Sequence, residues 1–250
     1  MREPPLTTVG SHSAPPTVSL PAADLVVGGF ERLSTVDWPG QLAAVVFCQG
    51  CAWRCAYCHN PHLLAFAPAA DAPPVPGWPE ILAWLPRRRG LLDAVVFSGG
   101  EATFQPGLPE ALRAVRAMGF KTGLHTGGPL PGRFAQCLPW LDWVGFDLKA
   151  PFDAYETVTL QRQGEQARQS LRMLRESGVA CEIRTTWHPS LLSDAALQTM
   201  ADTLVAEGFD EWVIQRFRPD GCLDSTLAAT PVGDLPPGLL TRADLRVLVR

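Results

Sequence analysis

Six short apolar runs, each ending in polar residues, limit what this chain can fold into more than any other feature of its sequence. They are LAAVVF (42–47), DAVVFSGG (93–100), KTGLHT (121–126), DWVGFDLK (142–149), ACEIRTT (180–186) and EWVIQRF (211–217). Apolar runs of this length, bounded by polar segments, are typical of buried strands. We therefore expect six strands, with the polar residues at their ends on one side of the sheet.

Segments with a helical period separate these runs. Residues 193–208 place their apolar side chains on one face, with Ser193 to cap the start and Gly208 to end it. Residues 107–119 repeat this pattern, whereas 167–178 and 79–90 do so less regularly. Strands that alternate with helices and contain few polar residues predict a parallel sheet covered by helices. The fold class we expect is α/β, a partial (β/α)6 barrel resembling an incomplete TIM barrel, whose chemistry lies at the carboxyl ends of the strands.

The length of 250 residues suits one such domain. Residues 1–27 are rich in Pro, Ser, Thr and Ala without apolar periodicity, which predicts a disordered, flexible tail. Residues 28–220 would form the barrel, and residues 221–250 a C-terminal extension packed on it. The chain has no apolar stretch approaching the ~18 residues of a membrane helix, and its start lacks the apolar core of a signal peptide, so we expect a cytoplasmic protein without membrane contact. A net charge of −4 argues against a nucleic-acid partner.

The sequence CQGCAWRCAYCHN, residues 48–60, brings four cysteines into one loop. In a reducing compartment such a cluster is typical of metal binding rather than of disulfides. Cys51, Cys55 and Cys58 could hold zinc with His59, or three irons of a [4Fe-4S] cluster whose fourth iron stays open. Zinc sites usually draw ligands from two separate segments, and adjacent residues rarely ligate one ion well, so the spacing favours the cluster.

A cluster with four protein thiolates, using Cys48 as well, remains an alternative. Cys48 falls at the end of an expected buried strand, where a small apolar cysteine is common. An open iron is chemically useful, because it can bind the amine and carboxylate of a substrate. The loop alone therefore predicts a metal centre and leaves its exact ligand set open.

The stretch CAWRCAYC resembles the CxxxCxΦC signature of the radical S-adenosylmethionine (SAM) superfamily, with Tyr57 as the aromatic residue, and SGGE at 98–101 agrees with it. The resemblance implies a [4Fe-4S] cluster on Cys51, Cys55 and Cys58, with SAM bound to the open iron. One electron then cleaves SAM to methionine and a 5'-deoxyadenosyl radical, which abstracts hydrogen.

A narrower resemblance covers about residues 28–220. The stretches GGFERLSTVDWPG, YCHNP, FDLKAP and IQRFRP resemble glycyl-radical activating enzymes, most closely those that activate anaerobic ribonucleoside-triphosphate reductase. This resemblance implies that the radical takes hydrogen from a glycine of a large partner, and that a reduced flavodoxin or ferredoxin supplies the electron. Two alternatives remain: a radical SAM enzyme acting on another glycyl-radical enzyme, a small molecule or a peptide, and a non-catalytic zinc or iron-sulfur module.

Five residues at two strand ends are candidate SAM ligands by this resemblance. Gly99, Gly100 and Glu101 resemble the element that holds the SAM amino group, with glycine permitting close approach and the carboxylate a charge-assisted hydrogen bond. Asp147 and Lys149 alternate along a strand and so share one side of its end, and the family uses both near the ribose and carboxylate of SAM.

The third strand end departs from the family pattern. The family usually has Asp-Thr-Asn-Gly there, and this chain has His-Thr-Gly-Gly at 125–128. Because imidazole is a poor ligand for Na⁺ or K⁺, we expect no firmly held monovalent cation. His125 would instead donate to the SAM carboxylate while protonated or bond the ribose while neutral, with Thr126 beside it. His188, just past the fifth run, is a candidate contact for the adenine or else a surface residue.

Overall fold

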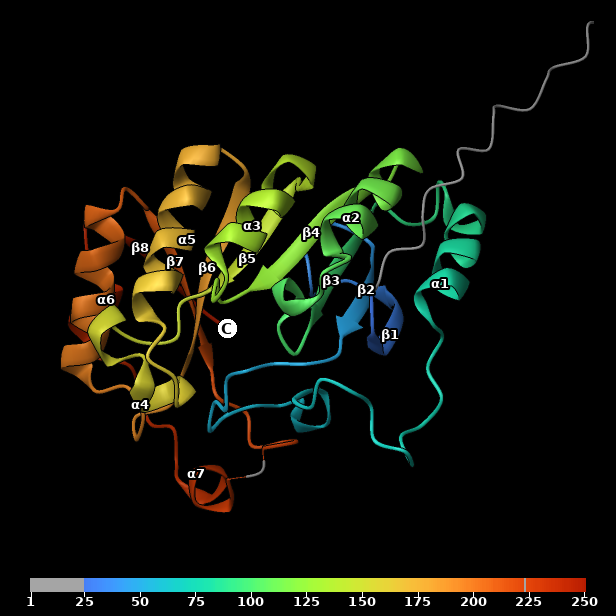
Figure 1. Ribbon diagram of the computed structural model, residues 1–250. Coiled ribbons are helices and arrows are strands. Elements are labelled where there is room, and N and C mark those ends of the chain that lie inside the picture. The colour runs from blue at the N-terminus through green and yellow to red at the C-terminus, as the bar shows by residue number, and fades with distance from the viewer. Residues whose placement is uncertain (1–24, 223) are drawn as a thin grey trace, which may run out of the picture.

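The computed structural model describes residues 25–222 and 224–250, which form one eight-stranded sheet in the order of the sequence (Figure 1). The strands are β1 (Val27–Ser34), β2 (Ala43–Cys48), β3 (Ala94–Gly99), β4 (Lys121–Thr126), β5 (Trp143–Asp147), β6 (Ala180–Trp187), β7 (Glu211–Arg216) and β8 (Arg246–Val249). Strands β2 to β8 are parallel, and β1 is antiparallel to β2. The six apolar runs are β2 to β7, so the predicted partial barrel is confirmed.

Both ends of the sheet extend beyond the six predicted strands. Leu25 and Val27 are buried and Val27 begins β1, so residues 25–27 belong to the fold rather than to the tail in which we placed them. The rest of the expected tail, residues 1–24, lies outside the described residues. Strand β8, from the expected C-terminal extension, pairs with β7. The end of the chain therefore adds a strand to the sheet as well as packing beside it.

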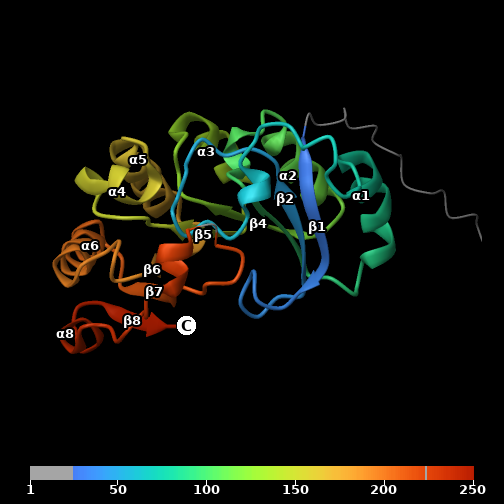
Figure 2. The same ribbon diagram turned by 90° about the horizontal axis from the view of Figure 1, so that it is seen from below.

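Helices cover the outer, convex face of the curved sheet (Figure 2). The helices of the structure are α1 (Trp78–Trp84), α2 (Leu108–Ala117), α3 (Pro131–Cys137), α4 (Glu156–Thr159), α5 (Gly164–Ser177), α6 (Asp194–Ala206), α7 (Ser225–Ala229) and α8 (Pro237–Leu240). Of these, α7 lies beyond the carboxyl ends of the strands and not on the convex face (Figure 1). Ser193 caps α6 by accepting from the amide of Ala196, as the sequence predicts. The short α3 was not predicted, because seven residues are too few to show a period. Within the described residues, no helix is long and apolar enough to span a bilayer.

A smaller apolar cluster fills part of the inner, concave face. It consists of Trp38, Ala43, Val45, Ala94, Val96 and Trp143. Trp38 comes from the β1–β2 turn and stacks on Trp143, with ring centroids 5.3 Å apart. Gly123 on β4 leaves room for it, since a Cβ there would lie 3.0 Å from the Trp38 ring. The turn therefore lies against the concave face, and the carboxyl ends of the strands remain available for the site.

Candidate active site

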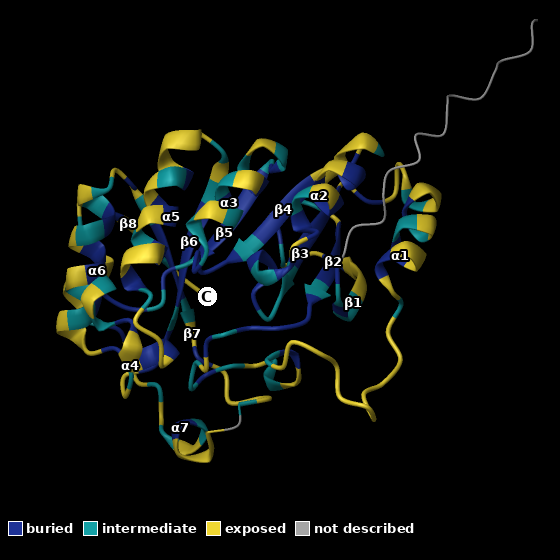
Figure 3. Cartoon of the chain, in the orientation of Figure 1, coloured by how far each residue is buried: buried dark blue, intermediate teal, exposed yellow. Residues whose placement is uncertain are grey.

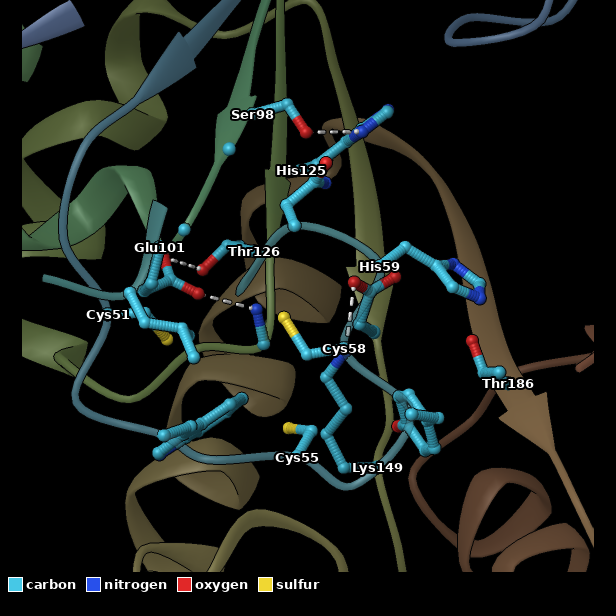
Figure 4. A pocket seen from close by; sticks show the side chains of 18 of the residues that line it. Cys51, Cys55, Cys58, His59, Ser98, Glu101, His125, Thr126, Lys149 and Thr186 are labelled. Carbon is cyan, nitrogen blue, oxygen red and sulfur yellow. Dashed lines mark hydrogen bonds and ion pairs between the residues drawn. The ribbon is translucent and has the colours of Figure 1, made fainter. Parts of the chain in front are cut away.

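One cavity opens at the carboxyl ends of β3 to β6, beneath the loop that follows β2 (Figure 4). Cys51, Cys55 and Cys58 all line it. The predicted cofactor-binding residues Tyr57, Gly99, Gly100, Glu101, His125, Thr126, Asp147 and Lys149 line it as well. Parallel strands end at the same edge, and for this reason residues as far apart in the sequence as Cys51 and Thr186 meet here.

The thiols of this cavity could bind a positively charged metal centre. Burial raises the pKa of Cys51 to about 12 and that of Cys55 to about 11. Their thiolates therefore need a compensating positive charge, which iron would supply. Cys48 lies fully buried in β2, does not line the cavity, and has a pKa raised far above its ordinary value, chiefly by burial. This position argues against a cluster with four protein thiolates.

A structural zinc site does not fit the loop. His59, the fourth ligand such a site would need, places Nε2 2.9 Å from the carbonyl of Arg218 and stacks on Phe217. Across residues 25–222 and 224–250, no three His, Cys, Asp or Glu side chains converge closely enough to hold one metal ion.

The two glycines after β3 fit the strand end against the cysteine loop. The amide of Gly100 donates to the carbonyl of Cys48, and that of Glu101 to the carbonyl of Gly50, both at 2.9 Å. A Cβ on Gly100 would lie 2.4 Å from the Gly50 carbonyl oxygen, and Gly99 has a φ of +115°. These glycines therefore allow the end of β3 to pack against the backbone of Cys48 and Gly50.

Glu101 is only 4% exposed and accepts four hydrogen bonds, of which Figure 4 draws the one from Thr126 and the one from the amide of Gly127. Its Oε1 accepts from the amide and hydroxyl of Thr103 and from the hydroxyl of Thr126, whereas Oε2 accepts only from the amide of Gly127, at 2.9 Å. Burial raises the pKa of Glu101, and these hydrogen bonds oppose the rise. Oε2 thus keeps acceptor capacity that a ligand's amino group could use. Thr126 lines the cavity, and its hydroxyl donates to Glu101 Oε1.

Asp147 lies between two cations. Its Oδ2 accepts from Lys149 Nζ at 3.1 Å, and its Oδ1 accepts from Arg184 Nε and Nη2 at 2.9 and 2.7 Å. Burial alone would raise the pKa of Asp147, but Arg184 and Lys149 outweigh it and hold that pKa well below its ordinary value. Lys149 Nζ also lies 5.7 Å from the ring centre of Tyr57, whose buried hydroxyl has no hydrogen-bond partner among the described residues. The positive charge of Lys149 therefore lies close to Tyr57, whose hydroxyl makes no hydrogen bond to the described residues.

Arg184 is one of the polar residues that end the run ACEIRTT, so it was expected at this edge of the sheet, but the sequence analysis gave it no role toward SAM. It is 8% exposed and lines the cavity from β6. Gly145 on β5 makes room for it, because a Cβ there would lie 2.8 Å from the guanidinium carbon. The period of two along ACEIRTT places Arg184 and Thr186 on one face, and Gly145 shares a face with Asp147, so this pairing had a sequence signal.

His125 requires a correction, because its ring nitrogens bond protein groups. Nε2 lies 2.7 Å from the carbonyl of Asp37, which can only accept, so Nε2 carries the hydrogen. Nδ1 then accepts from the hydroxyl of Ser98 at 3.1 Å. Burial and Arg184 lower the pKa of His125 to about 3, so the ring is neutral. Neither expected role fits: the ring is not protonated for the SAM carboxylate and has no free nitrogen for the ribose.

The prediction for His188 is also wrong. It is fully buried and absent from the cavity lining, so it is neither an adenine contact nor a surface residue. Its Nδ1 accepts from the amide of Ser190 at 3.1 Å, and its ring lies edge-on to Phe217 with centroids 5.2 Å apart. These contacts shape the turn that follows β6. His188 precedes a proline at a strand end, and this local sequence does not tell a ligand contact from a buried structural histidine.

A second cavity adjoins the first on the concave side. The β1–β2 turn, the end of β7, Arg218 and Arg250 line it. Five residues line both cavities: His59, His125, Asp147, Arg184 and Thr186. Two molecules bound in the two cavities would therefore meet at this shared wall.

Comparison with known proteins agrees with this geometry. The sequence profile of the Radical SAM superfamily matches residues 45–201. A candidate glycyl-radical enzyme activating enzyme of Methanocaldococcus jannaschii is 28% identical over 228 residues, covering 83% of this chain and 86% of that protein. The pyruvate formate-lyase-activating enzyme of Clostridium pasteurianum is 33% identical over 135 residues, which are 53% of this chain and 56% of that enzyme.

Two solved structures share the fold. QueE from Escherichia coli superposes with a TM-score of 0.56 at 17% identity, over 90% of this chain and 93% of QueE. SuiB from Streptococcus suis superposes with a TM-score of 0.56 at 15% identity, over 81% of this chain and 47% of SuiB, so this chain spans about half of it. At such identities the likeness concerns the architecture alone.

Proposed function

The chain belongs to the radical SAM superfamily, whose members use a [4Fe-4S] cluster and SAM, and we propose that it activates a glycyl-radical enzyme. The observation that carries this proposal is the convergence of the three loop thiols, Glu101 and the Asp147–Lys149 pair on one cavity. When bound and reduced, the cluster supplies the electron that cleaves SAM to methionine and a 5'-deoxyadenosyl radical, which takes a hydrogen atom from the glycine of the partner. The relatives named as activating enzymes support this activity.

Each group of the cavity has a proposed task. Cys51, Cys55 and Cys58 hold three irons. Glu101 Oε2, which accepts a single hydrogen bond from the protein, receives the amino group of SAM. Lys149 faces the carboxylate and ribose region beside Asp147, and its charge is stable because Asp147 raises its pKa well above the ordinary value despite burial. Tyr57 lines the cavity, and its buried hydroxyl has no hydrogen-bond partner among the described residues.

The second cavity is the proposed route for the partner. It reaches the first cavity at the wall that includes His125, Arg184 and Thr186. A partner segment in it would bring a glycine to the side of SAM. We propose anaerobic ribonucleoside-triphosphate reductase as the partner to test first and reduced flavodoxin or ferredoxin as the electron donor, following the resemblance in the motifs.

The test uses anaerobically reconstituted protein, dithionite, SAM and a candidate partner. A glycyl radical detected by electron paramagnetic resonance, with one 5'-deoxyadenosine formed per radical, is the expected result. A Cys55→Ser variant with the same partner is the matched control and should give neither product. SAM cleavage without a radical on any glycyl-radical partner would contradict the proposed activity.

A small anionic substrate is the second candidate, because the second cavity contains Arg216 and Arg218, and Arg218 makes no ion pair within the described residues. In that case SAM cleavage would accelerate with a small anionic molecule and not with a protein. Measuring 5'-deoxyadenosine formation with each class of substrate separates the two.

A further inference from the structure

The β1–β2 turn, residues 35–42, forms one wall of the second cavity. Val36 and Asp37 line that cavity, and the Val36 side chain is 78% exposed. At its far end the turn is bonded to the sheet by Lys121, which donates to Gln41, and by Asp93, which accepts from the amide of Leu42. Near the second cavity it makes two further contacts with the sheet. One is apolar, the stacking of Trp38 on Trp143. The other is polar and involves the backbone carbonyl of Asp37 itself.

His125 makes the polar contact. Its Nε2 donates to the Asp37 carbonyl at 2.7 Å, and the hydroxyl of Ser98 donates to Nδ1 at 3.1 Å, so the two partners fix the tautomer from both sides. The His125 side chain is 10% exposed, and its edge rests on Trp143 with centroids 5.6 Å apart. A hydrogen bond from a buried, immobile ring fixes the position of the turn more firmly than one from solvent would.

We propose that His125 is a positioning residue for the partner segment, acting by holding the Asp37 turn in place as a wall of the second cavity. The identity of the partner in this proposal rests on the proposed function. The attachment of the turn to His125 rests only on the hydrogen bonds of the His125 ring. Both ring nitrogens are engaged with protein, so His125 does not contact SAM through either. Loss of this attachment should therefore weaken recognition of the partner and leave SAM affinity intact.

Two neutral variants test the donor. The amide of glutamine reaches the place of histidine Nε2 and can donate to the Asp37 carbonyl, whereas the amide of asparagine reaches only the place of Nδ1. We compare His125→Gln and His125→Asn in cluster-loaded protein without oxygen. The three measurements are hydrogen exchange of residues 33–41, the Kd of SAM, and KM and kcat for the partner.

In His125→Asn we expect exchange of the turn to be about tenfold faster and KM for the partner about tenfold higher, with the Kd of SAM within about twofold of wild type. His125→Gln should resemble wild type in all three. Weaker SAM binding in His125→Asn with unchanged exchange would overturn the proposal, as would equal losses in both variants. If no partner acquires a radical, the proposed function fails. The difference in hydrogen exchange between His125→Asn and His125→Gln, together with their Kd values for SAM, still shows whether His125 holds the turn in place.

Discussion

The two faces of the sheet are built on different principles. The convex face is apolar and lies under helices, and strands β2 to β6 are buried along most of their length (Figure 3). The concave face carries a small aromatic cluster and, beside it, two sets of polar contacts: Ser98–His125–Asp37 and Arg184–Asp147–Lys149. Apolar packing depends on volume and is tolerant of similar residues, whereas a buried polar network depends on every donor finding its acceptor. The contrast suggests that stability resides largely on one face and ligand specificity on the other.

Two cysteines seven residues apart give the largest expected contrast. Cys55 lines the cavity and Cys48 belongs to the convex core. Reconstituted wild-type protein should contain about four irons per chain. Cys55→Ala should lose nearly all of them, while Cys48→Ala keeps them and loses about 1 kcal/mol of unfolding free energy. Iron analysis and denaturation measure the two effects, and normal iron content in Cys55→Ala would refute the cluster assignment.

Leu112 tests the convex face. It is fully buried on α2, so Leu112→Ala should lower the free energy of unfolding by about 2–5 kcal/mol through lost burial and a residual cavity. The Kd of SAM should stay within about twofold of wild type below the unfolding transition. Urea denaturation and a SAM binding assay on the same sample measure both quantities. A large loss of SAM affinity would show that the two faces are not separable.

Glu101 gives the next effect, on the ligand side. Glu101→Ala should weaken SAM binding by about 1.5–3 kcal/mol, the range for a lost charge-assisted hydrogen bond. It should also destabilise the fold, since Thr103, Thr126 and Gly127 lose their acceptor. Glu101→Gln is the control that keeps the shape. Unchanged SAM affinity in Glu101→Ala, with the iron content intact, would remove Glu101 from the binding site.

His125 makes the polar contacts of the concave face sensitive to acid. Its pKa is about 3 in the folded protein, against an ordinary value near 6.5, because burial and Arg184 disfavour the proton more than Asp147 and the Asp37 carbonyl favour it. The unfolded state thus binds more protons, and the stabilisation is full above pH ~6.5 and declines as the pH falls toward the folded pKa. Between pH 7 and 5, wild type should lose about 1–2 kcal/mol more unfolding free energy than His125→Gln. Parallel curves for the two proteins would contradict a neutral, buried His125.

Potassium should have the smallest effect. Arg184 already places a positive charge on Asp147, so a further cation beside that carboxylate would be repelled. Replacing K⁺ by a large organic cation at constant ionic strength should change SAM cleavage by less than about twofold, under ~0.5 kcal/mol. His125→Asp, which adds an oxygen donor, should introduce a potassium requirement. A strong dependence in the unmodified protein would show that the cavity holds a cation after all.

The sequence by itself determined the six central strands, the main helices, and the cysteines, glycines, Glu101, Asp147 and Lys149 of the first cavity. These follow from local patterns, because a period of two or 3.6 and a cap such as Ser193 act within a few residues. The spacing of the cysteines likewise indicated their chemistry before any fold was known. The structure confirmed this alternation and placed those residues together.

Only the tertiary structure decided the inner face. Asp37 meets His125 across 88 positions, and Asp147 meets Arg184 across 37, so both contacts depend on strand register and on the path of the β1–β2 turn. Hydrogen-bond partners of a buried histidine are set by which groups surround it, and no local pattern specifies those groups. For this reason the sequence assigned His125 to the ligand and left His188 as either an adenine contact or a surface residue. In the structure, the ring nitrogens of both histidines bond protein groups.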